Sequence, residues 1–176
     1  MNSLFQNKKI GWIGTGVMGL SMCKHLISNG ANVYVYNRTI SKVDPLLKLG
    51  AISADPITIA KEVDYLFLIV GFPIDVENLT IGENGILKHM KKGSFLIDHT
   101  TSSPKLAIKI FDEAIKYGVH SFDVPVTGGD IGAKEGKLIS FVGGDKNYFD
   151  EIKPLIEIYS KCLKSANCRT RVIYVR

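Results

Sequence analysis

The sequence predicts an α/β protein of the Rossmann type, with a doubly wound, mainly parallel sheet. Short β-rich runs alternate with helical stretches along the chain, and several helical stretches end at a glycine. The runs read as strands are almost continuously apolar, which is typical of strands covered by helices on both faces. A chain of 176 residues with 45% hydrophobic composition is long enough to form one compact domain.

The first part of the predicted sheet is a βαβ unit. Its first strand reads KKIGWIG and ends at Gly14, and the helix that follows, VMGLSMCKHLISN, is closed by Gly30. The second strand reads NVYVYN and leads into a helical stretch, SKVDPLLKL, closed by Gly50. The first strand-to-helix turn is therefore expected at residues 14–19.

The same alternation continues toward the C-terminus. Three further strands read YLFLIVG, SFLIDHT and VHSFDVPV, and the helix SPKLAIKIFDEAIKY, which stops at Gly118, separates the last two. A strand KLISFVGG follows. An amphipathic helix is then expected from Asp145 to about Tyr159, with Pro154 marking a break inside it.

Charge and hydropathy exclude two classes of partner. The net charge is +5, but the lysines are scattered, which predicts no nucleic-acid partner and a mild preference for anionic small molecules. The longest apolar run, Tyr65 to Val70, is far shorter than the ~20 residues that a membrane span requires. No membrane segment is therefore expected.

The cysteines and the first residues bear on location. Cys23, Cys162 and Cys168 have neither C-x-x-C spacing nor an even count, which argues against a disulfide framework and favours a reducing compartment. The first nine residues lack the apolar core of a secretory signal and the arginines of a transit peptide. A cytoplasmic location is expected, with a mitochondrial one as the alternative if a leader is missing.

Three glycines follow the first strand in G-x-G-x-x-G spacing. The spacing alone is a weak signal, but its place between a strand and a helix strengthens it. Gly14 permits the tight turn, Gly16 lets a pyrophosphate approach the backbone, and Gly19 lets the helix pack closely. The helix N-terminus adds free N–H groups. The motif predicts a dinucleotide site, and the alternative is a turn that binds nothing. The expected cofactor-binding residues are Gly14, Thr15, Gly16, Val17, Met18 and Gly19.

The end of the second strand indicates which dinucleotide is bound. It carries Asn37, Arg38 and Thr39 where an acidic residue normally holds the ribose 2′-hydroxyl of NAD. Arg38 can pair with a 2′-phosphate, and Asn37 and Thr39 can donate hydrogen bonds to it. NADP is therefore favoured over NAD. The alternative is a solvated arginine beside an adenosine site that takes either cofactor.

Two further strand ends face the edge of the sheet where ligands bind in open α/β folds. After the strand SFLIDHT, Thr101 is expected to contact the nicotinamide ribose, although residues 100–103 read equally well as a helix N-cap ahead of Pro104. His99 is expected to be structural, and no catalytic or metal-binding residue is predicted. After the strand YLFLIVG, the expected cofactor contacts are Val70, Gly71, Phe72 and Pro73.

The run DVPVTGGDIGAKEGKL, residues 123–138, contains four glycines and follows another strand at the same edge. Its backbone N–H groups can converge on an anion, and the Thr127 hydroxyl adds a donor. A small-molecule carboxylate substrate is therefore expected at Thr127, Gly128 and Gly129. On the residues alone, a hairpin whose glycines merely turn the chain is an equal alternative.

The runs WIGTGVMGLSM and DVPVTGGDIGAKEGKL together resemble the cofactor and substrate signatures of the β-hydroxyacid dehydrogenase family, and especially its plant-type 3-hydroxyisobutyrate dehydrogenase-like members. The resemblance covers about Lys9 to about Lys161, with Thr127 where a serine is commoner. It implies an NADP-binding domain over residues 1–161 and a divergent tail over 162–176. It also implies hydride transfer between NADP(H) and a short 3-hydroxy acid or semialdehyde.

The resemblance also implies what the chain lacks. Family members continue into a glycine-rich segment, a lysine acting as general acid and base, and an all-helical dimerisation domain, whereas this tail reads KCLKSANCRTRVIYVR. The chain is therefore expected to be inactive alone, with a non-catalytic nucleotide-binding or interaction module as the alternative. Apolar faces left open are expected to cause self-association. The residues expected in those faces are Leu155, Ile156, Ile158 and Tyr159.

Overall fold

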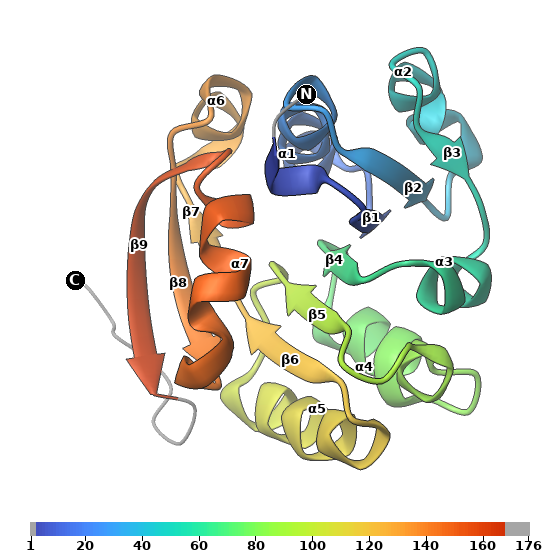
Figure 1. The fold of residues 1–176 in the computed structure, drawn as a ribbon, viewed down its shortest axis with the longest axis vertical. Coiled ribbons are helices and arrows are strands. Elements are labelled where there is room, and N and C mark those ends of the chain that lie inside the picture. Colours follow the sequence, from blue (N-terminus) through green and yellow to red (C-terminus); the bar gives the residue numbers. More distant parts are fainter. Residues whose placement is uncertain (1–2, 168–176) are drawn as a thin grey trace.

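The computed structural model describes residues 3–167, and the Rossmann-type sheet predicted from the sequence is confirmed in them (Figure 1). The strand order is β3-β2-β1-β4-β5-β6-β8-β7, and β9 pairs with β8. The strands are β1 (Lys9–Ile13), β2 (Asn32–Tyr36), β3 (Ile52–Ser53), β4 (Tyr65–Leu68), β5 (Phe95–Asp98), β6 (His120–Asp123), β7 (Val126–Thr127), β8 (Leu138–Gly144) and β9 (Ser160–Asn167). Strands β1 to β6 are parallel, so their carboxyl ends share one edge. The chain reverses its direction of travel across the sheet between β1 and β4, which is where ligands bind in such folds.

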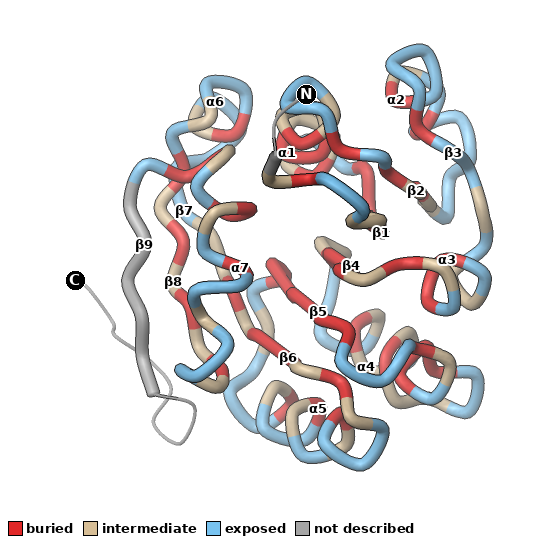
Figure 2. Tube along the Cα trace, in the orientation of Figure 1, coloured by how far each residue is buried: buried red, intermediate tan, exposed pale blue. Residues whose placement is uncertain are grey.

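The helices form a layer on each face of the sheet. Each layer encloses its own apolar core: one forms around Trp12 of β1 and the inner faces of α1, α6 and α7, and the other around Leu66 of β4 and the inner faces of α3, α4 and α5. Figure 2 shows the buried residues concentrated on the strands and the inner helix faces. The helices are α1 (Val17–Ser28), α2 (Asp44–Leu47), α3 (Pro56–Glu62), α4 (Pro73–Ile81), α5 (Pro104–Tyr117), α6 (Gly129–Glu135) and α7 (Phe149–Ile156). None of these helices is long and apolar enough to cross a membrane.

Two expectations for the last helix were wrong. Pro154 lies inside α7 without ending it: only its own N–H donor is missing, the helix continues to Ile156, and Glu157 N–H still donates to Lys153 O at 3.0 Å. The apolar face of α7 packs against the sheet instead of remaining open. Leu155, Ile156 and Tyr159 are fully buried there and Ile158 is half-buried, so these residues do not form an exposed surface for self-association.

Beyond β6 the sheet is mixed. β6 and β7 pair with β8 in one continuous antiparallel register, and β9 pairs with β8 in parallel over Ser160–Asn167. The backbone therefore continues the sheet past Lys161, the expected domain end. Residues 168–176, with Cys168, lie outside the described residues.

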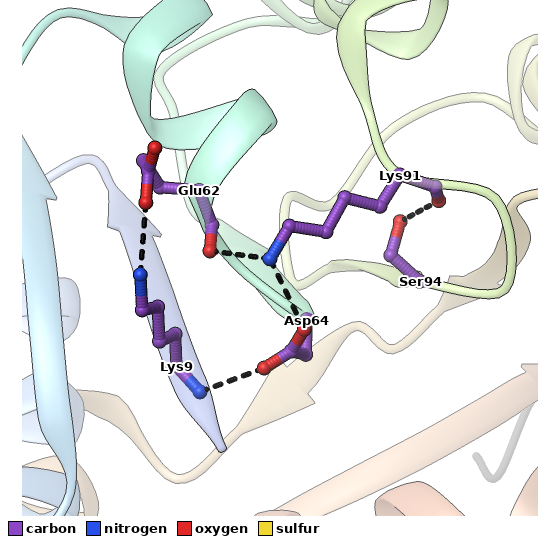
Figure 3. A network of polar contacts seen from close by, with 5 residues as sticks. All are labelled: Lys9, Glu62, Asp64, Lys91 and Ser94. Carbon is purple, nitrogen blue, oxygen red and sulfur yellow. Dashed lines mark hydrogen bonds and ion pairs between the residues drawn. The ribbon is translucent and has the colours of Figure 1, made fainter. Parts of the chain in front are cut away.

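Ion pairs and hydrogen bonds connect the amino ends of three parallel strands (Figure 3). Just before β4, the Asp64 carboxylate accepts a hydrogen bond from the Lys9 backbone N–H at 2.9 Å and pairs with Lys91 Nζ at 3.3 Å. Lys9 Nζ pairs with Glu62 at 2.8 Å, and Ser94 Oγ donates to Lys91 O at 2.6 Å. The starts of β1, β4 and β5 are thus joined at the edge opposite the glycine-rich turn.

Removing the Asp64 carboxylate should weaken this edge. Asp64→Ala removes the acceptor of the Lys9 N–H and the ion-pair partner of Lys91, whose ammonium keeps only its bond to Glu62 O at 2.7 Å. We therefore expect the free energy of unfolding to fall by about 1 kcal/mol, since the site is partly screened by solvent. Urea unfolding measures this. Glu113→Ala, which removes an exposed ion pair on the surface of α5, is the control and should have little effect. Equal losses in both variants would contradict a specific role for Asp64.

Candidate functional site

The turn between β1 and α1 is held by close packing of backbone. Gly14 has φ +101°, and a Cβ atom there would lie 2.0 Å from Ile69 O. A Cβ at Gly19 would lie 2.1 Å from Gly14 O. Gly16 differs, because a Cβ there would meet nothing within 4 Å. The fold therefore requires glycine at positions 14 and 19. At position 16 it does not, and the space beside Gly16 at the N-terminus of α1 is exposed and empty of protein atoms.

Two side chains fix the shape of this turn. Trp12 Nε1 donates to Gly14 O at 2.9 Å from within the core. From the end of β2, Asn37 Oδ1 accepts from Thr15 N–H at 2.9 Å, and Asn37 Nδ2 donates to Thr39 O at 2.9 Å. Asn37, predicted to contact a cofactor phosphate, thus also holds the glycine-rich turn against the end of β2.

Donor groups at the turn are left for a ligand. No side chain caps the N-terminus of α1, whose first N–H groups have no partner within the helix. The Thr15 hydroxyl is buried and has no hydrogen-bond partner among the described residues. Buried hydroxyls are normally paired, so an unpaired one beside an uncapped helix start fits a polar ligand. Of the helix residues predicted to contact the cofactor, Val17 is exposed and Met18 half-buried.

The end of β2 presents a cation to solvent. The Arg38 side chain is 87% exposed, and its Nη1 lies 3.5 Å from Oδ1 of Asp75 in the first turn of α4. Thr39 beside it is also exposed. Asp75 was not predicted: its position two residues after Pro73 marks a helix start, but nothing in the sequence indicates its contact with Arg38.

The other predicted contacts lie on two neighbouring loops at the same edge. Val70 N–H donates to Thr100 Oγ1 at 3.0 Å, which joins the loop after β4 to the loop after β5. Thr101 is exposed, and Ser103 caps α5 by accepting from Leu106 N–H at 3.2 Å, so the predicted N-cap is confirmed. Gly71, Phe72 and Pro73, which complete the predicted set, are exposed.

The glycine-rich run after β6 is not a simple loop. Its middle forms the short helix α6, and Gly128 and Gly129 at its start have φ +126° and +64°. Thr127, Gly128 and Gly129 are exposed. His25, in the last turn of α1, connects the C-terminal ends of α1 and α6, because its Nε2 lies 2.9 Å from Ala133 O and 3.1 Å from Lys134 O.

His99 is a structural residue, as predicted. Its Nδ1 lies 2.7 Å from Val124 O and must donate to it, so Nε2, 2.8 Å from Tyr159 Oη, accepts from the tyrosine hydroxyl. Burial lowers the pKa of His99 to about 4, against the raising effect of the Val124 hydrogen bond. Neutral His99 thus connects the end of β5 by hydrogen bonds to Val124, which precedes Thr127, and to Tyr159, which follows α7. The described residues hold no cluster that could bind a metal ion.

Comparisons with known proteins agree with this arrangement. A family model described as the NAD binding domain of 6-phosphogluconate dehydrogenase matches residues 9–168. The Arabidopsis thaliana protein "Probable 3-hydroxyisobutyrate dehydrogenase-like 1, mitochondrial" is 48% identical over 157 residues, which are 88% of this chain and 47% of that protein. The Escherichia coli (strain K12) protein "2-hydroxy-3-oxopropionate reductase" is 38% identical over 155 residues, 87% of this chain and 52% of that one. The chain spans about half the length of these curated relatives.

A solved structure described as "Psf3 in complex with NADP+ and 2-OPP" is similar in fold and sequence. Its TM-score is 0.86 at 28% identity, and the match covers 90% of this chain and 56% of that one.

Acid should destabilise the fold through His99. The unfolded chain takes up a proton near pH 6.5, whereas folded His99 does so only near pH 4, so stability falls as the pH falls through this window. The loss from His99 should be about 2 kcal/mol between pH 7 and pH 5. Urea unfolding at both pH values measures it. His99→Gln should reduce the loss, whereas the control His120→Gln, at a half-buried site, should retain most of it. An unchanged pH dependence in His99→Gln would argue against the assignment.

Proposed function

The chain belongs to the family of NAD-binding domains of 6-phosphogluconate dehydrogenase, and on this premise we propose that it is the NADP-binding domain of a 3-hydroxyisobutyrate dehydrogenase-like oxidoreductase. The observation that carries the proposal is the turn at Gly14–Gly19. Glycine is required there by the fold at two positions, and at the third it leaves room beside an uncapped helix and the unpaired Thr15 hydroxyl. A dinucleotide pyrophosphate fits these features.

The residues around the turn can hold the rest of the cofactor. N–H groups at the start of α1 would bind the pyrophosphate, and Arg38, with Thr39 beside it, would bind the 2′-phosphate. Exposed apolar side chains occur at the same edge, which suits the flat faces of an adenine and a nicotinamide. They are Val17, Ile40, Phe72, Ile74 and Ile131. The bound cofactor would supply or accept a hydride.

The substrate half of the proposal rests on the start of α6. Thr127 supplies a hydroxyl, and Gly128 and Gly129 present exposed backbone in the left-handed half of φ space, where N–H groups can face an anion. Lys134 and Lys137 are exposed and paired with Asp130 and Glu135, so neither is placed as a proton donor by the structure. We therefore propose that this part of the chain positions the carboxylate of a short hydroxy acid or semialdehyde and provides no general acid. The complete reaction then requires an acid from elsewhere.

The glycines allow fold and binding to be tested separately. Gly16→Ala should leave the free energy of unfolding nearly unchanged, because space is available, but should weaken NADPH binding, because the methyl group occupies the place of the pyrophosphate. Gly19→Ala should destabilise the fold by about 2 kcal/mol or more through its contact with Gly14 O. Thermal unfolding and cofactor titration measure both effects. Undiminished NADPH binding by Gly16→Ala would count against the site.

Arg38 should discriminate between the cofactors. Its hydrogen bond to a 2′-phosphate would be worth about 1.5–3 kcal/mol, so Arg38→Ala should weaken NADPH by about tenfold or more and NADH only slightly. The binding constants follow from quenching of Trp12, the single tryptophan, whose indole donates to the glycine-rich turn. Lys42→Ala removes a cation four residues away and is the control. Equal losses of NADPH and NADH would refute the role of Arg38.

A further inference from the structure

Arg38 meets a fixed carboxylate at the proposed 2′-phosphate position. Asp75 Oδ1 lies 3.5 Å from Arg38 Nη1, and its other oxygen, Oδ2, accepts from Phe72 N–H at 3.1 Å. The two side chains differ in how much room they have to move, because that of Arg38 is 87% exposed whereas that of Asp75 is 29% exposed. The carboxylate is therefore the anchored member of the pair and the guanidinium the mobile one.

The local fold keeps the Asp75 charge in place. Asp75 lies in the first turn of α4, where the helix dipole favours a negative charge, and its bond to Phe72 N–H satisfies an N–H group at the helix start. Gly71 packs close by, since a Cβ atom there would lie 3.4 Å from Asp75 Oδ2. Turning the Asp75 carboxylate away from Arg38 would therefore break its hydrogen bond with Phe72 N–H.

A 2′-phosphate bound by Arg38 would compete with this carboxylate. Both groups are anions, so the phosphate must either displace Asp75 from the guanidinium or share it at close range, where like charges repel. The 2′-hydroxyl of NAD is neutral and meets no such opposition. On the proposed function, we infer that Asp75 is a specificity-determining residue that weakens NADP(H) relative to NAD(H), so that the two cofactors bind with more similar affinity than Arg38 alone would give.

The effect should be moderate because the guanidinium of the pair is largely exposed to solvent. Repulsion between a phosphate and a carboxylate several ångströms apart in water, together with a competing surface ion pair, corresponds to roughly a three- to tenfold change in affinity. Salt screens such interactions over a Debye length of about 8 Å at physiological ionic strength. The effect of Asp75 should therefore shrink in concentrated salt.

The test is the ratio of the dissociation constants for NADPH and NADH in Asp75→Asn. The asparagine keeps a side-chain oxygen for Phe72 N–H, so the loop should persist, and thermal unfolding checks this. We expect NADPH to bind about three- to tenfold more tightly and NADH to be unchanged. Glu77→Gln is the matched control, because it removes the same charge from the same helix at a residue paired with Lys109. In an Arg38→Ala background the gain from Asp75→Asn should be smaller, because no cation then draws the phosphate toward Asp75.

The outcomes separate the inference from the proposed function. If the unaltered chain binds neither NADPH nor NADH, the proposed function fails and the inference with it. If it binds them but Asp75→Asn leaves the ratio unchanged, or weakens NADPH, the inference alone is overturned. Weaker NADPH binding would show that Asp75 holds Arg38 in place for the phosphate. A gain equal to that of Glu77→Gln would show only the effect of net charge and would also overturn it.

Discussion

The contact between Gly14 and the carbonyl of Ile69 is the constraint on which the site depends. It brings the turn after β1 against the end of β4 with no side chain between them, and Gly19, in the first turn of α1, packs equally closely on Gly14 O. With the backbone so placed, the Trp12 indole and the Asn37 amide can reach the same turn from the core and from β2. The start of α1 is aimed at the switch point of the sheet as a result.

The two edges of the sheet carry different kinds of polar group. At the amino edge, Asp64 and its lysine partners satisfy one another across three strands. At the carboxyl edge, Thr15 has a hydroxyl without a partner among the described residues and Arg38 is held by a single contact. Groups that stabilise the free chain and groups that remain available to a ligand are thus separated by the length of the strands.

The sequence predicts this fold well where local patterns decide the structure. Alternating apolar runs locate the parallel strands, and the glycine spacing locates the turn, because both follow from short-range geometry. A helix start at Asp55, whose carboxylate caps α3, was overlooked although Asp-Pro is a recognisable signal. The sequence did not predict helix α6, because glycines at both of its ends obscure a stretch of only seven residues.

Tertiary contacts account for the remaining differences. The burial of Leu155 and Tyr159 depends on how α7 crosses the sheet, which an amphipathic pattern cannot specify. The pair of Arg38 with Asp75 joins the end of β2 to the first turn of α4, thirty-seven positions apart in the chain, and no local signal marks it. Such contacts are decided by the folded arrangement alone.

The contact of His25 with the end of α6 bears on the distance between the two halves of the proposed site. Because one side chain of α1 contacts the carbonyls of Ala133 and Lys134, α1 and α6 pack together, and the two glycine-rich turns at which these helices begin are placed by that packing. Their spacing is then set by packing and not by the bound molecules. On the proposed function, a substrate would have to match that spacing with its own carbon skeleton, so acids would be selected by length as well as by charge.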